Sequence, residues 1–451
     1  MPGKHARPPG PHWSPLEGYR RRRNDVLSML TEVAAAHPRL AHLRILNRSV
    51  YVVVAPDLIR EVLVVRPGSV RKGTGIARAV PFLGAGLISN EGEVHKRHRR
   101  LVQPAFHKNR IQAYGHLMTA AAESLDWADG QRVDLAEEMG QLTFTIATAA
   151  MYGVDLPPEQ TAPARAAVQD FALMFRRLSY SPSALLMNLP GPLRSRYGRA
   201  RRRFDAALAG IVAHRRRRPG DDFLSLLLDS GLTDEEIFDE ARTFIAAGHE
   251  STSNALTWTL WLLDRHPDVL RRLRAEVDAL PGSPTVEDYP RLHYTRATVA
   301  ESMRVCPPVP VIGRRTIEPI TLDGWLIPAG DRLVTSPWVT HRDPRWWGPD
   351  AAAFKPERWL NETGEFSERH PGRPPLAYFP FGAGPRLCIG DGFAWLENAL
   401  VIATLIRRWQ LAIARDPRPI PAFTLRTEPP VTALLRSRGV VAADAAAGAP
   451  R

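Results

Sequence analysis

The sequence is poor in cysteine and lysine. Its 451 residues include two cysteines, Cys306 and Cys388, and five lysines beside 55 arginines. Two distant cysteines supply neither a disulfide framework nor the four ligands of a structural zinc site, so we expect a reducing compartment. No run of 18 or more apolar residues occurs, and the first forty residues lack the apolar core of a signal peptide. These absences predict a soluble, cytoplasmic protein without a membrane anchor.

Acidic residues are also too few to balance the basic ones, and the formal net charge is +13. Arginines gather at 20–23, 201–203 and 215–218, but these runs lack the interleaved aromatic residues of a nucleic-acid-binding surface. A solvated basic face is the simplest interpretation. An acidic protein partner or an anionic membrane surface are its functional alternatives. We expect no nucleic-acid partner.

Internal repeats and linkers are absent as well. A length of 451 residues would allow about two to four domains, yet no low-complexity segment divides the chain. We therefore expect one domain over residues 41–438, preceded by an N-terminal arm over 1–40. An Ala-rich disordered tail is expected over 439–451.

Three short segments favour β-structure. Hairpins are expected over 43–54, with a turn at 47–48, and over 320–327, with a turn at 323–324. A further strand is expected over 332–335. Most of the remaining sequence has helical character, so the fold class is mainly α with small β-sheets (α+β).

One helix is expected to be much longer than the others, over residues 234–265. Thr233 and Glu236 form a capping-box pattern at its start. Its middle, 246–254, is a poor helix sequence in which Gly248 alone costs about 1 kcal/mol relative to alanine. A kinked, buried helix would explain this segment, and so would a functional constraint that overrides helix propensity.

Cys388 lies in a glycine-rich loop. Three glycines between Phe381 and Gly390 allow the backbone to approach a large flat group closely. An apolar stripe with helical spacing follows, so Cys388 is expected beside a helix N-terminus, where N–H groups and the helix dipole favour a thiolate. A buried inert thiol and a nucleophilic thiol with a histidine base are the alternatives.

The loop resembles the haem-binding signature of the cytochrome P450 superfamily, Phe-x-x-Gly-x-Arg-x-Cys-x-Gly. Phe381, Gly384, Arg386, Cys388 and Gly390 occupy its fixed positions. The resemblance implies one large domain of that type, a soluble bacterial member, with the long central helix crossing the haem. It also implies haem b (iron protoporphyrin IX) as cofactor, with Cys388 as the axial metal ligand whose electron density favours O–O cleavage.

The middle of the long helix resembles the family's oxygen-activation motif. Glu250 and Ser251 occupy the acid and alcohol positions, with Ser251 in place of the usual threonine and Thr252 directly after it. The resemblance implies that Glu250, Ser251 and Thr252 are the catalytic residues that relay protons. Which of the two hydroxyls delivers them stays open.

Two further sets of residues match family patterns. Glu301 and Arg304, three apart on one helix face, match a Glu-x-x-Arg pair, and Arg358 matches its later partner, which implies a buried structural network. The resemblance also implies a cofactor-binding set around the haem and its propionates, which guanidinium groups suit well. Besides Cys388, this set contains His95, Arg99, Arg314, Phe381 and Arg386.

An apolar substrate pocket is expected from three segments of the chain. Its members are Phe82, Leu83, Leu87, Ile88, Phe244, Ala247, Val309, Val311 and Ile312. Such a pocket suits a terpene, a fatty acyl chain or a polyketide.

The implied reaction inserts one atom of O2 into a hydrophobic small molecule. NAD(P)H electrons would arrive through a separate ferredoxin or flavodoxin-type donor with its reductase, and a monomer is expected. An acidic donor would dock near Cys388 on a basic surface that contains Arg97, Arg100, Lys108, Arg407 and Arg408.

Two other activities stay open. A peroxide-driven peroxygenase would work with hydrogen peroxide and no electron donor. A non-catalytic haem-thiolate sensor would be insensitive to replacement of Glu250 or Ser251.

Overall fold

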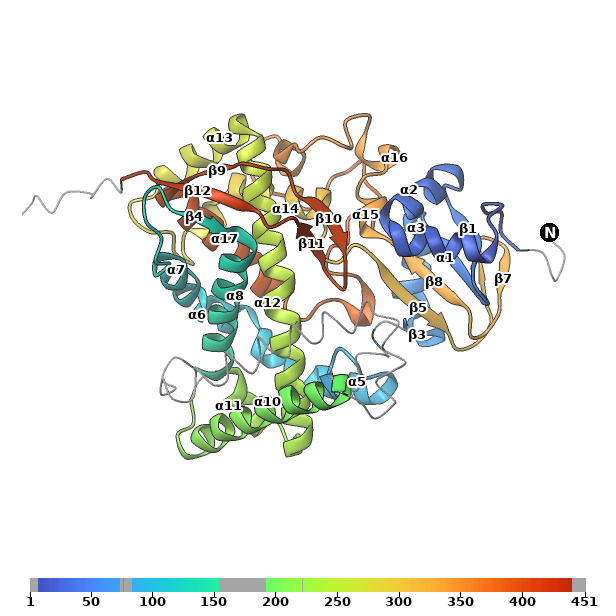
Figure 1. Ribbon diagram of the computed structural model, residues 1–451, viewed down its shortest axis with the longest axis horizontal. Coiled ribbons are helices and arrows are strands. Elements are labelled where there is room, and N and C mark those ends of the chain that lie inside the picture. The colour runs from blue at the N-terminus through green and yellow to red at the C-terminus, as the bar shows by residue number, and fades with distance from the viewer. Residues whose placement is uncertain (1–6, 74–75, 77–82, 154–191, 221, 440–451) are drawn as a thin grey trace, which may run out of the picture.

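The computed structural model of the chain describes residues 7–73, 76, 83–153, 192–220 and 222–439. Helices form the larger part of the molecule, and the N-terminal helices lie with the main sheet at one side of it (Figure 1). The expectation of a mainly α fold with small β-sheets is confirmed.

The helices differ greatly in length. Those that precede the longest one are α1 Pro15–Asn24, α2 Val26–Ala36, α3 Pro56–Arg60, α5 Gly92–Val102, α6 Lys108–Ala113, α7 Gly115–Glu123, α8 Leu135–Tyr152, α10 Pro192–Arg217 and α11 Phe223–Asp229. The longest and those that follow it are α12 Asp234–Arg265, α13 Pro267–Asp278, α14 His293–Val305, α15 Pro337–Thr340, α16 Pro344–Trp347 and α17 Asp391–Arg408.

The strands form four small sheets. They are β1 Leu40–Ile45, β2 Arg48–Val53, β3 Val70–Lys72, β4 Arg132–Asp134, β5 Ile312–Thr316, β6 Ile320–Leu322, β7 Trp325–Ile327, β8 Arg332–Thr335, β9 Trp409–Ile413, β10 Arg418–Pro421, β11 Leu425–Glu428 and β12 Thr432–Ser437. The largest sheet has the order β1-β2-β8-β5-β3, in which only β2 and β8 run parallel. The others are β4-β12-β9, β10-β11 and β6-β7.

Helix α12 spans the helical part of the molecule (Figure 1) and has the bounds expected from the sequence. The capping box is present, since the Thr233 hydroxyl caps the N–H of Glu236 and the Glu236 side chain accepts from the N–H of Thr233. Its C-terminal half is almost wholly buried and packs against α8, α14 and α17 in one hydrophobic cluster. This packing fixes the helix, so a residue in its middle has a defined position.

The expected hairpins are present. In the first, Ile45 pairs with Arg48, so the turn lies at residues 46–47, one residue earlier than expected. In the second, Leu322 pairs with Trp325 around Asp323-Gly324, where both turn residues have positive φ, as a tight two-residue turn requires.

The N-terminal segment packs on the sheet. Leu30 and Val33 of α2 belong to the same buried cluster as Leu43 of β1 and Val52 of β2. These contacts bury apolar surface from residues on both sides of residue 40.

Candidate active site

The loop before α17 contains backbone conformations that glycine adopts easily and other residues rarely adopt. Gly382 and Gly384 have φ of +75° and +67°. A Cβ at Gly384 would lie 2.1 Å from the carbonyl oxygen of Leu63, so the close approach of this neighbouring backbone also requires glycine. The N–H of Cys388 donates to Phe381 O at 2.9 Å, which closes the loop.

The Cys388 sulfur faces a cavity. The side chain is exposed toward this cavity, and the surrounding protein raises the pKa of its thiol to about 11 by desolvation. A hydrogen bond from the backbone of Gly390 and the charge of Arg99 lower the pKa in opposition. The thiol is therefore reachable from the cavity and shielded from bulk water, and a metal ion at the sulfur would displace its proton.

The cavity has a volume of about 1400 Å³, larger than a typical small-molecule pocket. Cys388 lines it together with Ala247, Gly248, Ser251 and Thr252 of α12. A Cβ on Gly248 would meet no atom within 4 Å, so this glycine leaves open space beside the helix. The cavity thus offers room for a large group and a substrate between the sulfur and α12.

Basic side chains gather at the edge of the cavity. Lys72 and Arg314 face each other across β3 and β5 and line the cavity with Arg386. Desolvation, followed by the charge of Arg386, lowers the pKa of Lys72 to about 7 and that of Arg314 to about 10. The same causes lower the pKa of buried His95 to about 3. Glu91 pairs with Arg386, and the charges of Glu91 and Glu240 raise the pKa of Lys72 in opposition.

This excess of positive charge fits haem. A flat group with two carboxylates at its edge would relieve the mutual repulsion of these cations, and guanidinium groups bind carboxylates well. Arg99 donates to Leu387 O at 2.7 Å and so contacts the cysteine loop directly. His95 and Arg99 are outside the cavity lining, whereas Arg314, Phe381 and Arg386 belong to it.

The acid and the two hydroxyls of α12 occupy different surroundings. Ser251 and Thr252 line the cavity, and their hydroxyls donate to Ala247 O at 2.8 Å and Gly248 O at 3.0 Å. Glu250 lies beside the cavity and is paired with Arg426 of β11. Both hydroxyls therefore bond to carbonyl groups one turn earlier, and α12 stays helical through this segment.

The structure brings Glu301, Arg304 and Arg358 together. Arg304 forms two hydrogen bonds to Glu301, at 2.7 and 2.8 Å, and both side chains are fully buried. Its remaining donors reach the carbonyl oxygens of His341, Ala351 and Ala353. Arg358 Nε lies 3.3 Å from Glu301 Oε1, and Trp359 donates to the other carboxylate oxygen.

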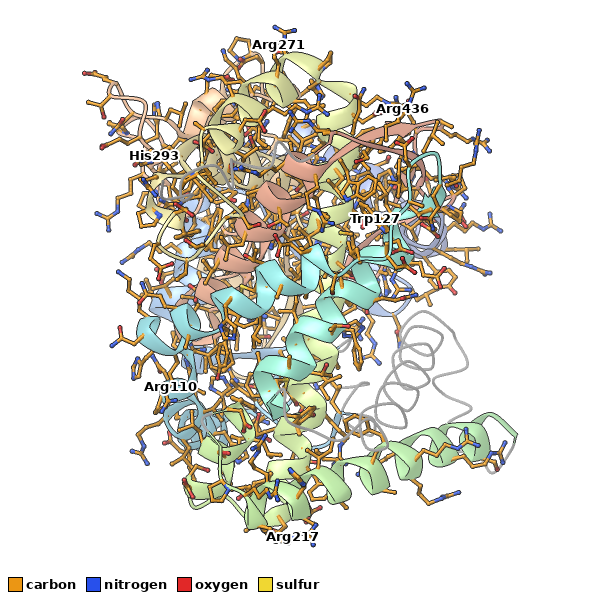
Figure 2. All side chains as sticks on the ribbon, turned by 90° about the vertical axis from the view of Figure 1, so that its left-hand side faces the viewer. Arg110, Trp127, Arg217, Arg271, His293 and Arg436 are labelled. Carbon is orange, nitrogen blue, oxygen red and sulfur yellow. The ribbon has the colours of Figure 1, made fainter. Side chains whose placement is uncertain are left out.

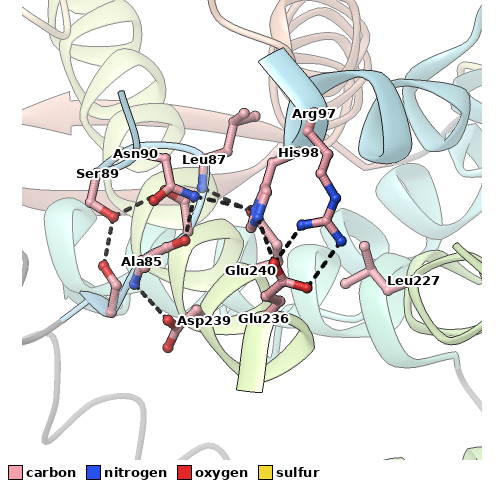
Figure 3. Close-up of polar contacts among 12 residues, drawn as sticks. Ala85, Leu87, Ser89, Asn90, Arg97, His98, Leu227, Glu236, Asp239 and Glu240 are labelled. Carbon is pink, nitrogen blue, oxygen red and sulfur yellow. Dashed lines mark hydrogen bonds and ion pairs between the residues drawn. The ribbon is translucent and has the colours of Figure 1, made fainter. Parts of the chain in front are cut away.

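A second buried polar cluster, which the sequence did not indicate, anchors the N-terminal half of α12 (Figure 3). His98 of α5 contacts Glu240 at 2.6 Å and Glu236 at 3.2 Å, and Arg97 pairs with Glu236 at 2.6 Å. Glu240 also accepts from the N–H of Leu87. These contacts fix α5 and the segment before it against α12, beside the cavity.

The predicted pocket is partly reproduced. Ile88, Phe244, Ala247, Val309, Val311 and Ile312 line the cavity. Leu83 and Leu87 are buried but are not part of the lining, which corrects their assignment. The N–H of Leu87 donates to Glu240, while Ile88, the next residue, lines the cavity. Phe82 lies outside the described residues.

The basic surface expected near Cys388 is only partly available. Arg97 pairs with Glu236, Arg407 donates to the carbonyl oxygens of Val277 and Leu280, and Arg408 donates to that of Glu123. Arg100 and Lys108 are exposed. Other arginines, such as Arg217, Arg271 and Arg436, point outward at widely separated places (Figure 2). The basic charge is therefore spread over the surface.

Sequence reasoning missed Lys72 and Arg426. Lys72 does not belong to a recognisable motif, although lysine is rare in this sequence and each of the five could have been considered. Arg426 is 176 residues from Glu250 in sequence, and only the position of the β10–β11 hairpin brings them together. No local signal in the sequence predicts that pair.

The mainly α fold, the cysteine loop on a large cavity and the cationic edge together define a haem-thiolate protein. The family model described as Cytochrome P450 matches residues 7–435, and the chain belongs to that family. None of the described helices combines the length and apolar composition needed to cross a bilayer.

Known members of the family are similar over most of the chain. Cyclooctat-9-en-7-ol 5-monooxygenase of Streptomyces melanosporofaciens is 35% identical over 404 residues, covering 86% of this chain and 85% of that protein. Pentalenene oxygenase of Streptomyces avermitilis is 32% identical over 405 residues, covering 87% and 88%. The crystal structure of CYP175A1 from Thermus thermophillus aligns with a TM-score of 0.74 at 28% identity, covering 92% and 96%. The protein is a haem-dependent monooxygenase that uses O2.

Proposed function

We propose that this monooxygenase oxygenates a terpene hydrocarbon or a terpene alcohol in the cavity beside Cys388. The main support is that one cavity of about 1400 Å³ contains the sulfur, the hydroxyls of Ser251 and Thr252, and apolar side chains. The names of two relatives specify an unsaturated alcohol and pentalenene as their substrates. A bulky apolar molecule also suits the apolar side chains that line the cavity, such as Ile88, Phe244 and Val309.

The residues of the chain have separate tasks in this proposal. When bound, haem would activate O2, from which the inserted oxygen atom comes. Cys388 would hold the iron from the loop, while Arg314, Arg386 and Lys72, with His95 and Arg99 near them, would hold the propionates. Phe381 would pack beside the cofactor. Cavity-lining apolar residues, among them Ile88, Phe244 and Val309, bind the substrate and exclude water.

Proton delivery is assigned to Glu250 and to a hydroxyl of α12. Ser251 and Thr252 face the cavity, and Glu250 lies next to them along the helix. A carboxylate can exchange protons with water and a hydroxyl can pass them on, so the pair provides a relay from outside to the reacting oxygen.

Electrons are proposed to come from NAD(P)H through a separate reductase and a ferredoxin or flavodoxin-type donor, in the cytoplasm. Exposed Arg100 and Lys108 are the parts of the expected docking surface that stay accessible to an acidic donor. We propose that the protein works as a monomer.

The experiment is a substrate panel on the haem-loaded protein. Terpene hydrocarbons and alcohols, fatty acids and polyketide lactones are titrated by optical difference spectra, and products are identified with NAD(P)H, ferredoxin and reductase. We expect saturable shifts and oxygenated products from the terpene group. Oxidation of fatty acids or lactones without any terpene product would overturn the substrate class. Equal product from hydrogen peroxide alone would indicate a peroxygenase.

A further inference from the structure

The β10–β11 hairpin is attached to one face of α12 at three successive turns. Glu250 accepts from Thr424, Asn254 donates to Thr424 at 2.9 Å, and Trp258 donates to Leu425 O at 2.9 Å. The three helix residues are four apart, so they share a face. The hairpin therefore lies along two turns of α12, from Trp258 to Glu250.

The contacts to Glu250 all end on the same carboxylate oxygen. Thr424 Oγ1 donates to Glu250 Oε1 at 2.7 Å, Arg426 Nε donates to it at 2.8 Å, and Arg426 Nη2 contacts it too. The side chains are 14% exposed for Glu250 and 22% for Arg426. Charge-assisted hydrogen bonds in such partly buried surroundings are strong and directional, so they fix the orientation of the carboxylate.

The same hairpin also borders the substrate space. The end of β10, with Ile420 and Pro421, and the turn residues Ala422 and Phe423 line the cavity, whereas Glu250 is not part of the lining. Thr424 is the last residue of the turn, and Arg426 is two residues further on. A molecule that presses on the turn is thereby connected, through a few residues of β11, to the acid on the helix.

We propose that Arg426 is a positioning residue that holds Glu250 for proton delivery and makes that delivery depend on contact between the substrate and the hairpin turn. The proposal rests on the proposed function, because it assigns Glu250 to the proton relay. Without Arg426, the carboxylate loses two of its contacts on Oε1 and is no longer aligned with the hydroxyls beside it. Electrons then leave as hydrogen peroxide, formed from O2, two electrons and two protons, in place of product.

Three variants distinguish a positioning role of Arg426 from a general disturbance of the hairpin. Arg426→Gln removes the charge, Arg426→Lys retains it, and Glu428→Gln removes the hairpin's other ion pair, with Arg418, at a site where Glu428 is 53% exposed. We expect Arg426→Gln to lower the share of electrons recovered in product about fivefold or more, with substrate affinity within about twofold. Arg426→Lys recovers most of the loss, and Glu428→Gln matches the parent. The solvent deuterium isotope effect on turnover rises in Arg426→Gln alone.

A second measurement, thermal unfolding, needs no substrate. Thermal unfolding of Arg426→Gln, Glu250→Gln and the double variant tests the pair itself. We expect the double variant to melt close to the less stable single variant. Additive losses would overturn the contact.

The remaining outcomes also decide the proposal. Unchanged electron recovery in Arg426→Gln would overturn it, and so would a loss of substrate affinity at unchanged recovery, which would make Arg426 a substrate-binding residue only. If no panel compound is oxidised by the parent while the double variant shows the expected coupling, the proposed substrate class fails and the Glu250–Arg426 contact stands.

Discussion

Arg304 and Arg386 are arginines in the interior of the same molecule, yet their surroundings differ. All five donors of Arg304 are used by Glu301 and by three backbone carbonyl groups. Arg386 has Glu91 and Asn90 O as partners, and it shares its side of the cavity with Lys72 and Arg314. The first cluster is balanced, because Glu301 and Asp350 pair with Arg304 and Arg358. The second has three cations, of which Arg386 pairs with Glu91.

The difference separates a structural cluster from a ligand site. A buried charge that is fully paired stabilises the fold only while its partners stay in place. Desolvation first of all, and then the charge of Arg386, lowers the pKa of Lys72 and of Arg314, and an anionic ligand would relieve the repulsion among these cations. Removing a member should therefore destabilise the first cluster and weaken ligand binding at the second.

The largest expected effect is at the ligand site. Cys388→Ala should abolish the far red-shifted band of the reduced protein under carbon monoxide, because that band requires thiolate ligation of the iron. Cys306→Ala is the matched control, since this thiol is buried in the core and its pKa is raised to about 12 by burial. An intact band in Cys388→Ala would show that the Cys388 sulfur is not the iron ligand.

The next largest effect is at the balanced cluster. Glu301→Gln leaves the charge of Arg304 buried without its carboxylate, and the free energy of unfolding should fall by about 3–5 kcal/mol. Denaturant unfolding measures it. Glu357→Gln breaks the more exposed pair with Arg272 and keeps an amide oxygen that can accept from the Tyr294 hydroxyl, so it should cost only about 0–1 kcal/mol. Equal losses in both variants would contradict the distinction.

A smaller effect is expected for replacement of Arg314, and it should weaken haem binding without destabilising the fold. Arg314→Gln should speed haem transfer to a scavenger protein about tenfold, or about 1.4 kcal/mol. The melting temperature of the haem-free protein should not fall, because one member of a repelling group has gone. Arg315→Gln, at the exposed neighbouring position on β5, serves as control. A lower melting temperature for Arg314→Gln would make it a structural arginine like Arg304.

The smallest effect concerns His98, which is surrounded by Glu240, Glu236, Arg97 and Asn90 (Figure 3). The hydrogen bond to Glu240 raises the pKa of His98 above the unfolded value of about 6.5. A raised pKa means that the folded state binds the proton more tightly, so this stabilisation is full below about pH 6.5 and is lost as the pH rises through the folded pKa.

His98→Gln should therefore flatten the decline of the melting temperature with pH above about 6.5. Glu236 titrates well below this window, since Arg97 first of all lowers its pKa to about 2. The exposed His116→Gln should keep the parent's slope. If His98→Gln keeps it too, another group causes the pH dependence.

The parts of the site that the sequence predicted have local signals. The bounds of α12 follow from a capping box and a terminating His-Pro pair, and the 320–327 hairpin follows from Asp323-Gly324. The Cys388 loop is recognisable because glycines are needed at positive φ. By contrast, no local signal distinguishes Ile88, which lines the cavity, from Leu87, whose backbone N–H donates to Glu240 on another helix.

The sequence by itself determined the class of fold. It also led to the predictions of Cys388 as the iron ligand, of Glu250 with Ser251 and Thr252, and of the set Glu301, Arg304 and Arg358, since each depends on a short run of residues. The tertiary structure decided which charges balance one another. It placed Lys72 beside Arg314 and Arg426 against Glu250, over separations of 242 and 176 residues. Such pairs arise when packing of apolar surface fixes the elements in space, and a charged side chain carries no local mark of the partner that packing brings to it.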